Sequence, residues 1–303
     1  MQRPILITGA TGFVGAALTE ACDGEGRAWI GQGTNNRIAA ECFVAADFSA
    51  PFDLSPVLAD VEAVVHLAGM AHVPARDGEA RKRAMRINVE ATAELAQQAV
   101  RAGVRRFIFV SSIKSRMSRA GAEDLDFYGT TKKLAEERIM AVASGTGMAV
   151  TVLRPCLMYG AGAKGNLASM MHWVGRGIPL PLGLVANRRS LMHVRNFADL
   201  ILRCLDSRDP VCGLFSAVDG GVFSTPALLR ATAKALGKTA WLFPFPPALL
   251  FLGARLLGRG GMAEKLLGDL VVDGSELTSR LGWRPPFTPE QGFVEMAAGL
   301  RGK

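Results

Sequence analysis

The feature that most constrains this chain is a glycine-rich turn near its start. Gly9, Gly12 and Gly15 recur at intervals of three, between an apolar run over 3–7 and a helical pattern over 13–22. In a strand–turn–helix unit of this kind, the first glycine permits the tight turn and the second lets backbone amides approach a pyrophosphate. The third lets the helix pack closely against the strand, with its positive N-terminal end facing the phosphates. The spacing predicts a dinucleotide-binding turn at the first strand of a parallel sheet.

Strand and helix signals alternate along the 303 residues, of which 49% are hydrophobic. A chain of this length and composition can bury a large core. The alternation predicts an α/β fold, a Rossmann-type doubly wound parallel sheet with a smaller α/β lobe.

A Tyr-x-x-x-Lys pattern lies about 115 residues beyond the glycine turn. Tyr128 and Lys132 are four residues apart in the stretch 128–142, whose apolar residues recur at helical spacing. Both side chains therefore lie on one face of a helix. A nearby ammonium group stabilises phenolate over phenol and lowers the tyrosine pKa. The pattern predicts a general acid or base, although an isolated match is more often a surface tyrosine and a solvated lysine.

Two serines favour the chemical interpretation of that pair. The apolar run 106–110 ends in Ser111 and Ser112, and ligands of open α/β sheets bind at the carboxyl ends of strands. A serine at this position can hydrogen-bond the same substrate oxygen that Tyr128 protonates.

Further motifs extend along the chain: TGATGFVG at Thr8–Gly15, HLAG at His66–Gly69, Asn88-Val89, FVSS at Phe109–Ser112, YGTTK at Tyr128–Lys132, and Arg154-Pro155 followed by Tyr159-Gly160. With them the chain resembles the extended short-chain dehydrogenase/reductase family over nearly all of its length. In that family the catalytic serine matches Ser112, the acid/base tyrosine matches Tyr128, and the lysine that also touches the nicotinamide ribose matches Lys132. Ser111 is then a supporting hydroxyl.

The stretch 153–194 is most similar to bacterial nucleotide-sugar 4-ketoreductases and epimerases of surface polysaccharide and O-antigen synthesis. That resemblance implies NAD(P)H-dependent reduction of the C4 ketone of a UDP-4-keto-6-deoxy-N-acetylhexosamine. The product would be UDP-N-acetylquinovosamine or UDP-N-acetylfucosamine. Two alternatives stay open, a nucleotide-sugar 4-epimerase that retains NAD and a non-catalytic dinucleotide sensor.

The resemblance also assigns ligand contacts. The cofactor falls on Gly9, Thr11, Gly12, Phe13, Val14, Gly15, Asp47, Phe48, Leu67, Ala68, Gly69, Lys132 and Pro155. Asn166 matches the uridine-contacting asparagine, Leu180 and Leu182 match the residues beside the uracil, and Arg189 matches the diphosphate arginine. The planar fork of an arginine binds phosphate bidentately, which suits it to that role.

The end of the second strand bears on the choice of cofactor. An NAD-specific enzyme places an acidic residue there to hold the adenosine ribose, and the sequence 31–37 contains none. Arg37 could instead meet a 2′-phosphate. We therefore expect NADP in preference to NAD, the alternative being that Arg37 is an ordinary exposed arginine.

The substrate-binding lobe of the family is assembled from separated segments. We expect the dinucleotide domain to span 1–156, with 188–220 returning to it, so that 190–194 and the helix after Asn196 rejoin the main sheet. The substrate-binding lobe should comprise 157–187 and 221–303. The family also implies a homodimer, formed through helices around 86–99 and 128–142.

Neither cysteine nor histidine spacing indicates a metal site. Five cysteines lack any Cys-x-x-Cys pair and four histidines lack the spacing of metal ligands, so we expect free thiols and no bound metal. The first strand begins almost at Met1, which predicts a cytoplasmic protein without a signal peptide.

The chain carries a net charge of +8. A basic balance suits an enzyme whose ligands carry phosphates, and we expect no nucleic-acid partner; weak attraction to an anionic membrane surface is a further hypothesis. The apolar run 247–258 contains Arg255 and is shorter than the roughly 20 residues that span a bilayer. It predicts a packed helix of the smaller lobe and no integral membrane segment.

Overall fold

The computed structural model describes residues 3–34, 42–71, 77–117, 127–163, 166–257 and 260–301. The chain divides into two compact units. Unit 1 comprises Met1–Pro155, Phe197–Ala217 and Glu276–Trp283. Unit 2 comprises Cys156–Asn196, Val218–Ser275 and Arg284–Lys303.

Unit 1 is built on a seven-stranded sheet in the order β3-β2-β1-β4-β5-β6-β9. Its strands are β1 (Ile5–Thr8), β2 (Trp29–Gly33), β3 (Phe43–Ala45), β4 (Ala63–His66), β5 (Arg106–Val110), β6 (Ala149–Pro155) and β9 (Gly213–Ala217). Every neighbouring pair is parallel. This order and direction confirm the predicted Rossmann-type sheet, in which all carboxyl ends of the strands share one edge.

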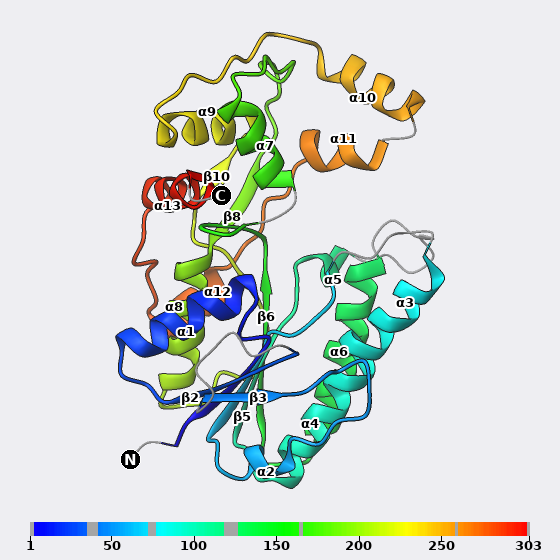
Figure 1. Ribbon diagram of the computed structural model, residues 1–303, viewed down its shortest axis with the longest axis vertical. Helices are drawn as coiled ribbons and strands as arrows, with labels where there is room; N and C mark the ends of the chain where they lie inside the picture. The colour runs from blue at the N-terminus through cyan, green and yellow to red at the C-terminus, as the bar shows by residue number, and fades with distance from the viewer. Residues whose placement is uncertain are drawn as a thin grey trace. The chain divides into compact units, whose positions relative to one another are not determined.

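Helices cover both faces of this sheet (Figure 1). They are α1 (Phe13–Gly24), α2 (Ser55–Leu58), α3 (Gly78–Met85), the π-helical turn η2 (Arg86–Glu90), α4 (Ala91–Arg101), α5 (Lys114–Met117), α6 (Phe127–Ala143), most of α8 (Val194–Asp206) and most of α12 (Ser275–Leu281). In Figure 1, α1 and α8 lie on one side of the sheet, with α4 and α6 on the other. The central strands are buried on both faces, which explains why their sequences are continuous apolar runs.

Unit 2 contains a three-stranded sheet in the order β10-β8-β7. Its strands are β7 (Leu157–Tyr159), β8 (Arg189–His193) and β10 (Val222–Phe223), and its helices are α7 (Asn166–Gly175), α9 (Thr225–Ala235), α10 (Pro247–Leu256), α11 (Gly260–Leu267) and α13 (Pro289–Arg301). A separate apolar cluster, which includes Leu191, Leu229 and Phe293, forms the core of this unit.

Two segments differ from the sequence-based division. Residues 190–194 were expected in the main sheet, but β8 pairs parallel with β7 and antiparallel with β10. The edge of the main sheet beside β6 is taken by β9 instead. Within the segment expected to form the smaller lobe, α12 and Trp283 belong to unit 1, where the Trp283 indole donates a hydrogen bond to Asp199 at 2.6 Å.

The apolar run around α10 also differs from expectation. The sequence predicted a packed helix, yet none of its residues is buried. Among the described residues, no helix combines the length and the apolar character needed to cross a bilayer.

Candidate active site

The glycine turn after β1 has the geometry that its spacing predicts. Gly9 has φ +68°, and a Cβ there would lie 2.9 Å from the Ala68 backbone nitrogen. A Cβ on Gly15 would collide with the carbonyl oxygens of Gly9 and Ala10. Gly12 precedes the first turn of α1 and provides no side-chain cap for it. This cradle, which only glycine can form, fits the pyrophosphate of a dinucleotide.

A buried glutamine fixes this turn to the neighbouring strands. Gln32 in β2 donates through Nε2 to the Ala46 carbonyl oxygen at 2.6 Å and accepts from the Gly9 amide at 3.3 Å. Its own carbonyl accepts from the Ala10 amide at 3.2 Å. Sequence reasoning missed Gln32, although a polar residue inside an apolar strand is the signal that could have found it.

The residues expected on the adenine side lie after β3. Asp47 is exposed and accepts two hydrogen bonds at 2.8 Å from the amide and hydroxyl of Ser49, which lower the pKa of its carboxyl group. The ring of Phe48 is buried in the core, with its centroid 4.6 Å from that of Phe52, so only its backbone is available to a ligand. Arg37 lies outside the described residues.

A buried histidine holds the loop that begins at Leu67. His66 Nδ1 is 2.6 Å from the Thr8 hydroxyl oxygen, and Nε2 is 2.9 Å from that of Thr92. Thr8 also accepts from the amides of Leu67 and Ala68. Burial lowers the pKa of His66 to about 3, so the ring is neutral and serves as a structural link.

Lys132 on α6 is the buried cation of the site, with 3% of its surface exposed. Its Nζ donates to the Val110 carbonyl oxygen at 2.9 Å, and lies 4.6 Å from the Phe109 ring centroid and 5.9 Å from that of Tyr128. A Cβ on Gly69 would lie 3.3 Å from the same Nζ. Lys132 therefore contacts β5, the loop after β4 and the tyrosine of its own helix.

Burial lowers the pKa of Lys132 from its usual 10.5 to about 8, against the opposing effect of the Glu136 carboxylate. A lysine with this pKa remains mostly protonated near neutral pH. Its positive charge favours a tyrosinate at Tyr128.

Asn88, in the π-helical turn η2, joins this lysine helix to the loop after β4. Its Oδ1 accepts from the Met70 amide at 2.7 Å, and its Nδ2 donates to the Met70 carbonyl at 3.0 Å and the Thr131 hydroxyl at 3.0 Å. The Asn88-Val89 motif indicated the segment, but only the fold shows that the amide positions the turn before Lys132.

Glu136 connects the same helix to the ends of β5 and β6. Its carboxylate is buried and accepts from the hydroxyls of Ser111 and Ser115, the latter at 2.7 Å. It also forms a two-point ion pair with Arg154, with distances of 3.0 Å from Nε and 2.5 Å from Nη2. Ser111 is thus committed to this internal network.

Ser112, by contrast, is only partly buried. Its hydroxyl oxygen accepts from the Lys114 amide at 3.3 Å. A Cβ on Gly129 would lie 2.5 Å from the Lys114 carbonyl oxygen, so this glycine allows the first turn of α6 to approach the loop. The loop that carries Ser112 therefore packs beside the turn that carries Tyr128.

Pro155 ends β6 and is buried at the same sheet edge. Its carbonyl oxygen accepts from the Ile113 amide at 3.0 Å, which joins the two loops that follow β5 and β6. Thr11, Phe13 and Val14 surround the start of α1, and none of the three is fully buried. Unit 1 therefore gathers the described nicotinamide-side and phosphate-side residues at one edge of its sheet.

The residues assigned to the nucleotide half lie in unit 2. Asn166 is the first residue of α7. Leu180 and Leu182 are buried in the core of the unit. Arg189 begins β8, donates to the Gly268 carbonyl oxygen at 3.2 Å, and has its pKa lowered by burial. Their ligand contacts stay predictions.

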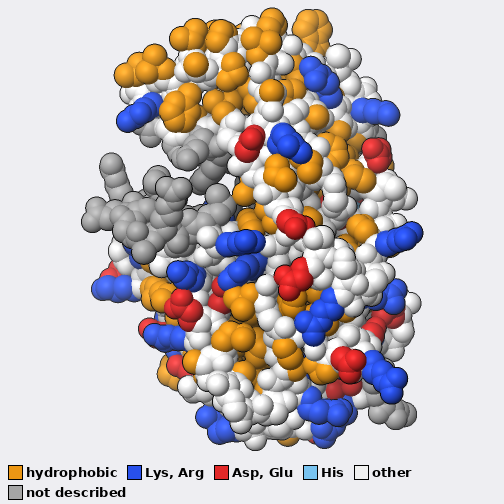
Figure 2. Space-filling view, turned by 180° about the vertical axis from the view of Figure 1, so that it is seen from behind, with side chains coloured by type: hydrophobic (Ala, Val, Ile, Leu, Met, Phe, Trp, Pro, Cys, Tyr) orange, Lys and Arg blue, Asp and Glu red, His pale blue; other side chains and the backbone are white. Residues whose placement is uncertain are grey.

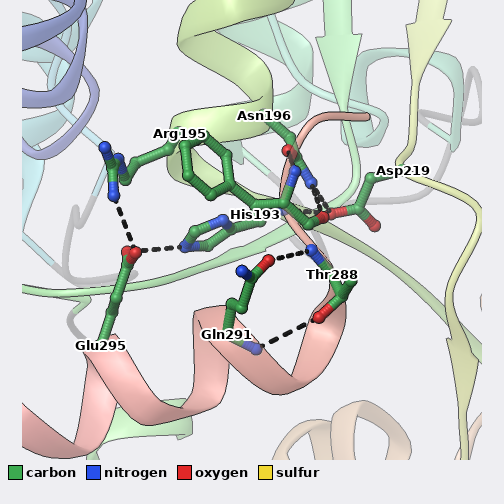
Figure 3. A network of polar contacts seen from close by, with 8 residues as sticks. His193, Arg195, Asn196, Asp219, Thr288, Gln291 and Glu295 are labelled. Atoms are coloured by element: carbon green, nitrogen blue, oxygen red, sulfur yellow. Dashed lines mark hydrogen bonds and ion pairs between the residues drawn. The ribbon is translucent and has the colours of Figure 1, made fainter. Parts of the chain in front are cut away.

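Unit 2 contains a second polar network, drawn in Figure 3. The Asp219 carboxylate accepts from the His193 amide at 2.7 Å and from the Asn196 side chain at 3.1 Å. Glu295 on α13 lies 3.3 Å from His193 Nε2 and 2.8 Å from an Arg195 nitrogen. Burial lowers the pKa of His193, which therefore stays neutral near physiological pH.

Comparison with known proteins agrees with this geometry. Residues 5–212 match the NAD dependent epimerase/dehydratase family. A UDP-glucose 4-epimerase of Vibrio cholerae is 35% identical over 98% of this chain and 95% of its own length. A ceramide reductase of Caulobacter vibrioides is 29% identical over 82% of this chain and 76% of its own.

Among solved structures, MoeE5 in complex with UDP-glucuronic acid and NAD superposes with a TM-score of 0.78 at 23% identity, covering 99% of both chains. This likeness shows the fold. The match over residues 5–212 and the 35% identity over nearly the whole chain show the family, and the chain belongs to the NAD dependent epimerase/dehydratase family of extended short-chain dehydrogenases/reductases.

Proposed function

We propose that the protein transfers a hydride between a nicotinamide dinucleotide and C4 of a UDP-linked sugar. The observation that carries the proposal is the buried Lys132, whose ammonium lies 5.9 Å from the Tyr128 ring centroid. The site offers a proton donor with a permanent cationic neighbour, beside a loop that carries the Ser112 hydroxyl. The dinucleotide, when bound in the glycine cradle, supplies or accepts the hydride.

Each residue has one task in this scheme. Tyr128 gives its hydroxyl proton to the C4 oxygen in reduction and removes it in oxidation. Ser112 donates a hydrogen bond to the same oxygen. Lys132 stabilises the tyrosinate by its charge, and Asn88 and Glu136 keep its helix in place.

We assign the UDP moiety to Asn166, Leu180, Leu182 and Arg189 of unit 2. The support is their match to the family motifs and the names of relatives such as the UDP-glucose 4-epimerase of Vibrio cholerae. Arg189 is the phosphate-binding residue of this set because guanidinium pairs bidentately with phosphate. The Leu180 and Leu182 side chains are packed in the core, so they would shape the uracil site from beneath.

The net reaction has two candidates. The first is 4-epimerisation, in which the hydride leaves C4 and returns to the opposite face while NAD stays bound. The name and 35% identity of the Vibrio cholerae relative favour it.

The second candidate is reduction of a UDP-4-keto-6-deoxy-N-acetylhexosamine to UDP-N-acetylquinovosamine or UDP-N-acetylfucosamine. The end of β2 favours it, because residues 27–40 include no carboxylate that could hold the adenosine ribose of NAD. The Gln32 side chain at that strand end is already committed to Ala46 and Gly9. A reductase with exchangeable NADPH fits this cofactor end.

One experiment separates the two candidates. The purified protein is denatured and the released dinucleotide identified, and the protein is then assayed with UDP-glucose, UDP-N-acetylglucosamine and the 4-keto sugar. Retained NAD with conversion of a UDP-sugar to its C4 epimer would establish the epimerase. Stoichiometric NADPH oxidation with the 4-keto sugar would establish the reductase. Failure of all substrates with either cofactor would contradict hydride transfer at C4.

We also propose that the protein is a cytoplasmic homodimer associated through α4 and α6. The support is the family expectation and Met140, a large apolar side chain exposed on α6. Sedimentation of the wild type and of Met140→Glu tests it, and a concentration-independent monomer in the wild type would contradict it.

A further inference from the structure

We propose that the apolar surface formed by α10 and the segment before it binds an anionic lipid bilayer. This surface consists of Trp241, Phe243, Leu249, Leu252, Leu256 and Leu257, all of them exposed. Trp241 is 66% exposed, Leu252 54% and Leu256 79%. Large apolar side chains grouped in this way on a folded unit mark an interaction surface.

The fold holds these side chains outward. Backbone hydrogen bonds join Leu180 to Trp241 and Phe243, at 2.8 and 3.1 Å. Along this extended segment the side chains alternate, so that Leu242 packs against the core of unit 2 while Trp241 and Phe243 are exposed. The outward position of the two aromatic rings is therefore built into the backbone pairing.

The helix follows the same rule. Leu250 of α10 packs against the core of unit 2. Leu249, Leu252 and Leu256 recur at helical spacing and form one exposed face. A helix anchored through a single leucine, with its other large apolar side chains exposed, presents an apolar face that unit 2 itself leaves uncovered.

Charge decides which partner fits. Residues 220–263 contain five basic residues and no acidic one. An apolar face set in such a purely cationic segment complements an anionic lipid surface, since basic side chains near the headgroups add attraction to that of apolar burial. Arg255 belongs to α10 itself and is exposed. Its aliphatic stem can follow the apolar face while its guanidinium reaches lipid phosphates.

Geometry sets the mode of binding. The ten residues of α10 span about 15 Å, half of the roughly 30 Å of a bilayer core. The helix is therefore long enough to lie in the interface and too short to cross it. Trp241 beside it is a residue type that favours the headgroup level. In Figure 2, hydrophobic side chains gather at the top of the view, with several Lys and Arg side chains at their margin.

This inference does not depend on the proposed reaction. It places the enzyme at the membrane surface whatever sugar it converts. The chemistry residues of unit 1 are not among those that form the surface.

The test is flotation of the full-length protein with extruded vesicles. We expect binding to vesicles of phosphatidylcholine mixed with phosphatidylglycerol, and weaker binding to phosphatidylcholine alone or at high salt. Leu252→Glu should lower the bound fraction by about tenfold or more, because it replaces buried apolar area with a charge. Leu214→Glu is the matched control, since Leu214 in β9 is 40% exposed and lies in unit 1.

Trp241 gives an independent readout. Binding should shift tryptophan emission to the blue, and Trp241→Phe should abolish most of that shift. Absence of flotation with anionic vesicles would overturn the proposal, as would equal loss in Leu252→Glu and Leu214→Glu. Self-association that Leu252→Glu abolishes, without vesicle binding, would assign the surface to a second copy of the chain and also overturn it. Activity of Leu252→Glu in solution should equal that of the wild type.

Discussion

Each unit of the molecule contains a buried polar network, and the two networks differ in how completely they are paired. In unit 1, Glu136 accepts through both oxygens, Asn88 uses both its oxygen and its nitrogen, and Lys132 donates to Val110. In unit 2, the Tyr159 hydroxyl, His193 Nδ1 and one Asp219 oxygen are buried without a hydrogen-bond partner among the described residues.

The difference teaches what each network does. Buried polar groups are normally satisfied, and a fully paired network fixes one arrangement of its members. The unit 1 network surrounds Lys132 and joins the loops that follow β4, β5 and β6, so its pairing positions chemistry. The unit 2 network joins β8, the start of α8 and α13 around a neutral histidine (Figure 3). We infer that it serves the stability of that unit.

The largest contrast should be between the two tyrosines of the chain. Tyr128→Phe should lower kcat by about 10²–10⁴-fold, because the C4 oxygen loses its proton donor. Dinucleotide affinity, measured by fluorescence titration, should change little.

Tyr159→Phe is the matched control, because Tyr128 and Tyr159 are the only tyrosines. It removes a hydroxyl that has no partner among the described residues, so activity should be unchanged and stability equal to or up to about 1 kcal/mol above that of the wild type. Similar kcat losses in both variants would contradict the assignment of Tyr128.

A second contrast compares the two glutamates. Glu136→Gln leaves the Arg154 guanidinium without its buried partner and should lower the free energy of unfolding by about 3 kcal/mol. Glu295→Gln affects a partly exposed carboxylate and should cost about 1 kcal/mol or less. Urea unfolding measures both.

Glu136→Gln carries a functional readout as well. Since Glu136 opposes the effect of burial on the pKa of Lys132, its neutralisation should move the alkaline limb of the kcat–pH profile to lower pH. Glu295→Gln should leave that limb in place. An unchanged limb in Glu136→Gln would show that Glu136 contributes to stability alone.

The third contrast is between activity and stability at Lys132. Below about pH 8 the folded protein must hold a buried ammonium, which is unfavourable relative to the unfolded chain. Lys132→Met should therefore raise the free energy of unfolding near neutral pH by about 2 kcal/mol, after loss of the hydrogen bond to Val110 is deducted. It should also abolish most activity.

The stabilisation has a defined pH dependence. Between about pH 8 and the usual lysine pKa of 10.5 the unfolded chain binds more protons than the folded wild type, so wild-type stability rises with pH. The advantage of Lys132→Met should shrink across this window, as thermal unfolding at several pH values can show. A constant advantage would mean that Lys132 is not charged in the folded protein at neutral pH.

Much of unit 1 follows from local sequence. The glycine turn, the strand that ends in Ser111 and Ser112, and the spacing of Tyr128 and Lys132 each lie within a few residues, so pattern alone predicted them. Gln32, Asn88 and Glu136 were not assigned a role, because their partners come from other segments of the chain. The placement of 190–194 was wrong for the same reason, since a short apolar strand matches the edge of either sheet.

The sequence by itself determined the Rossmann-type fold, the family and the residues that carry the proposed chemistry, because those depend on periodicity and on spacing within one turn or one helix. Only the tertiary structure decided which buried polar groups are paired, that β8 joins the small sheet, and that the apolar side chains of α10 remain exposed. These depend on which distant segments meet. Burial and hydrogen bonding are properties of those meetings, and no single stretch of sequence contains them.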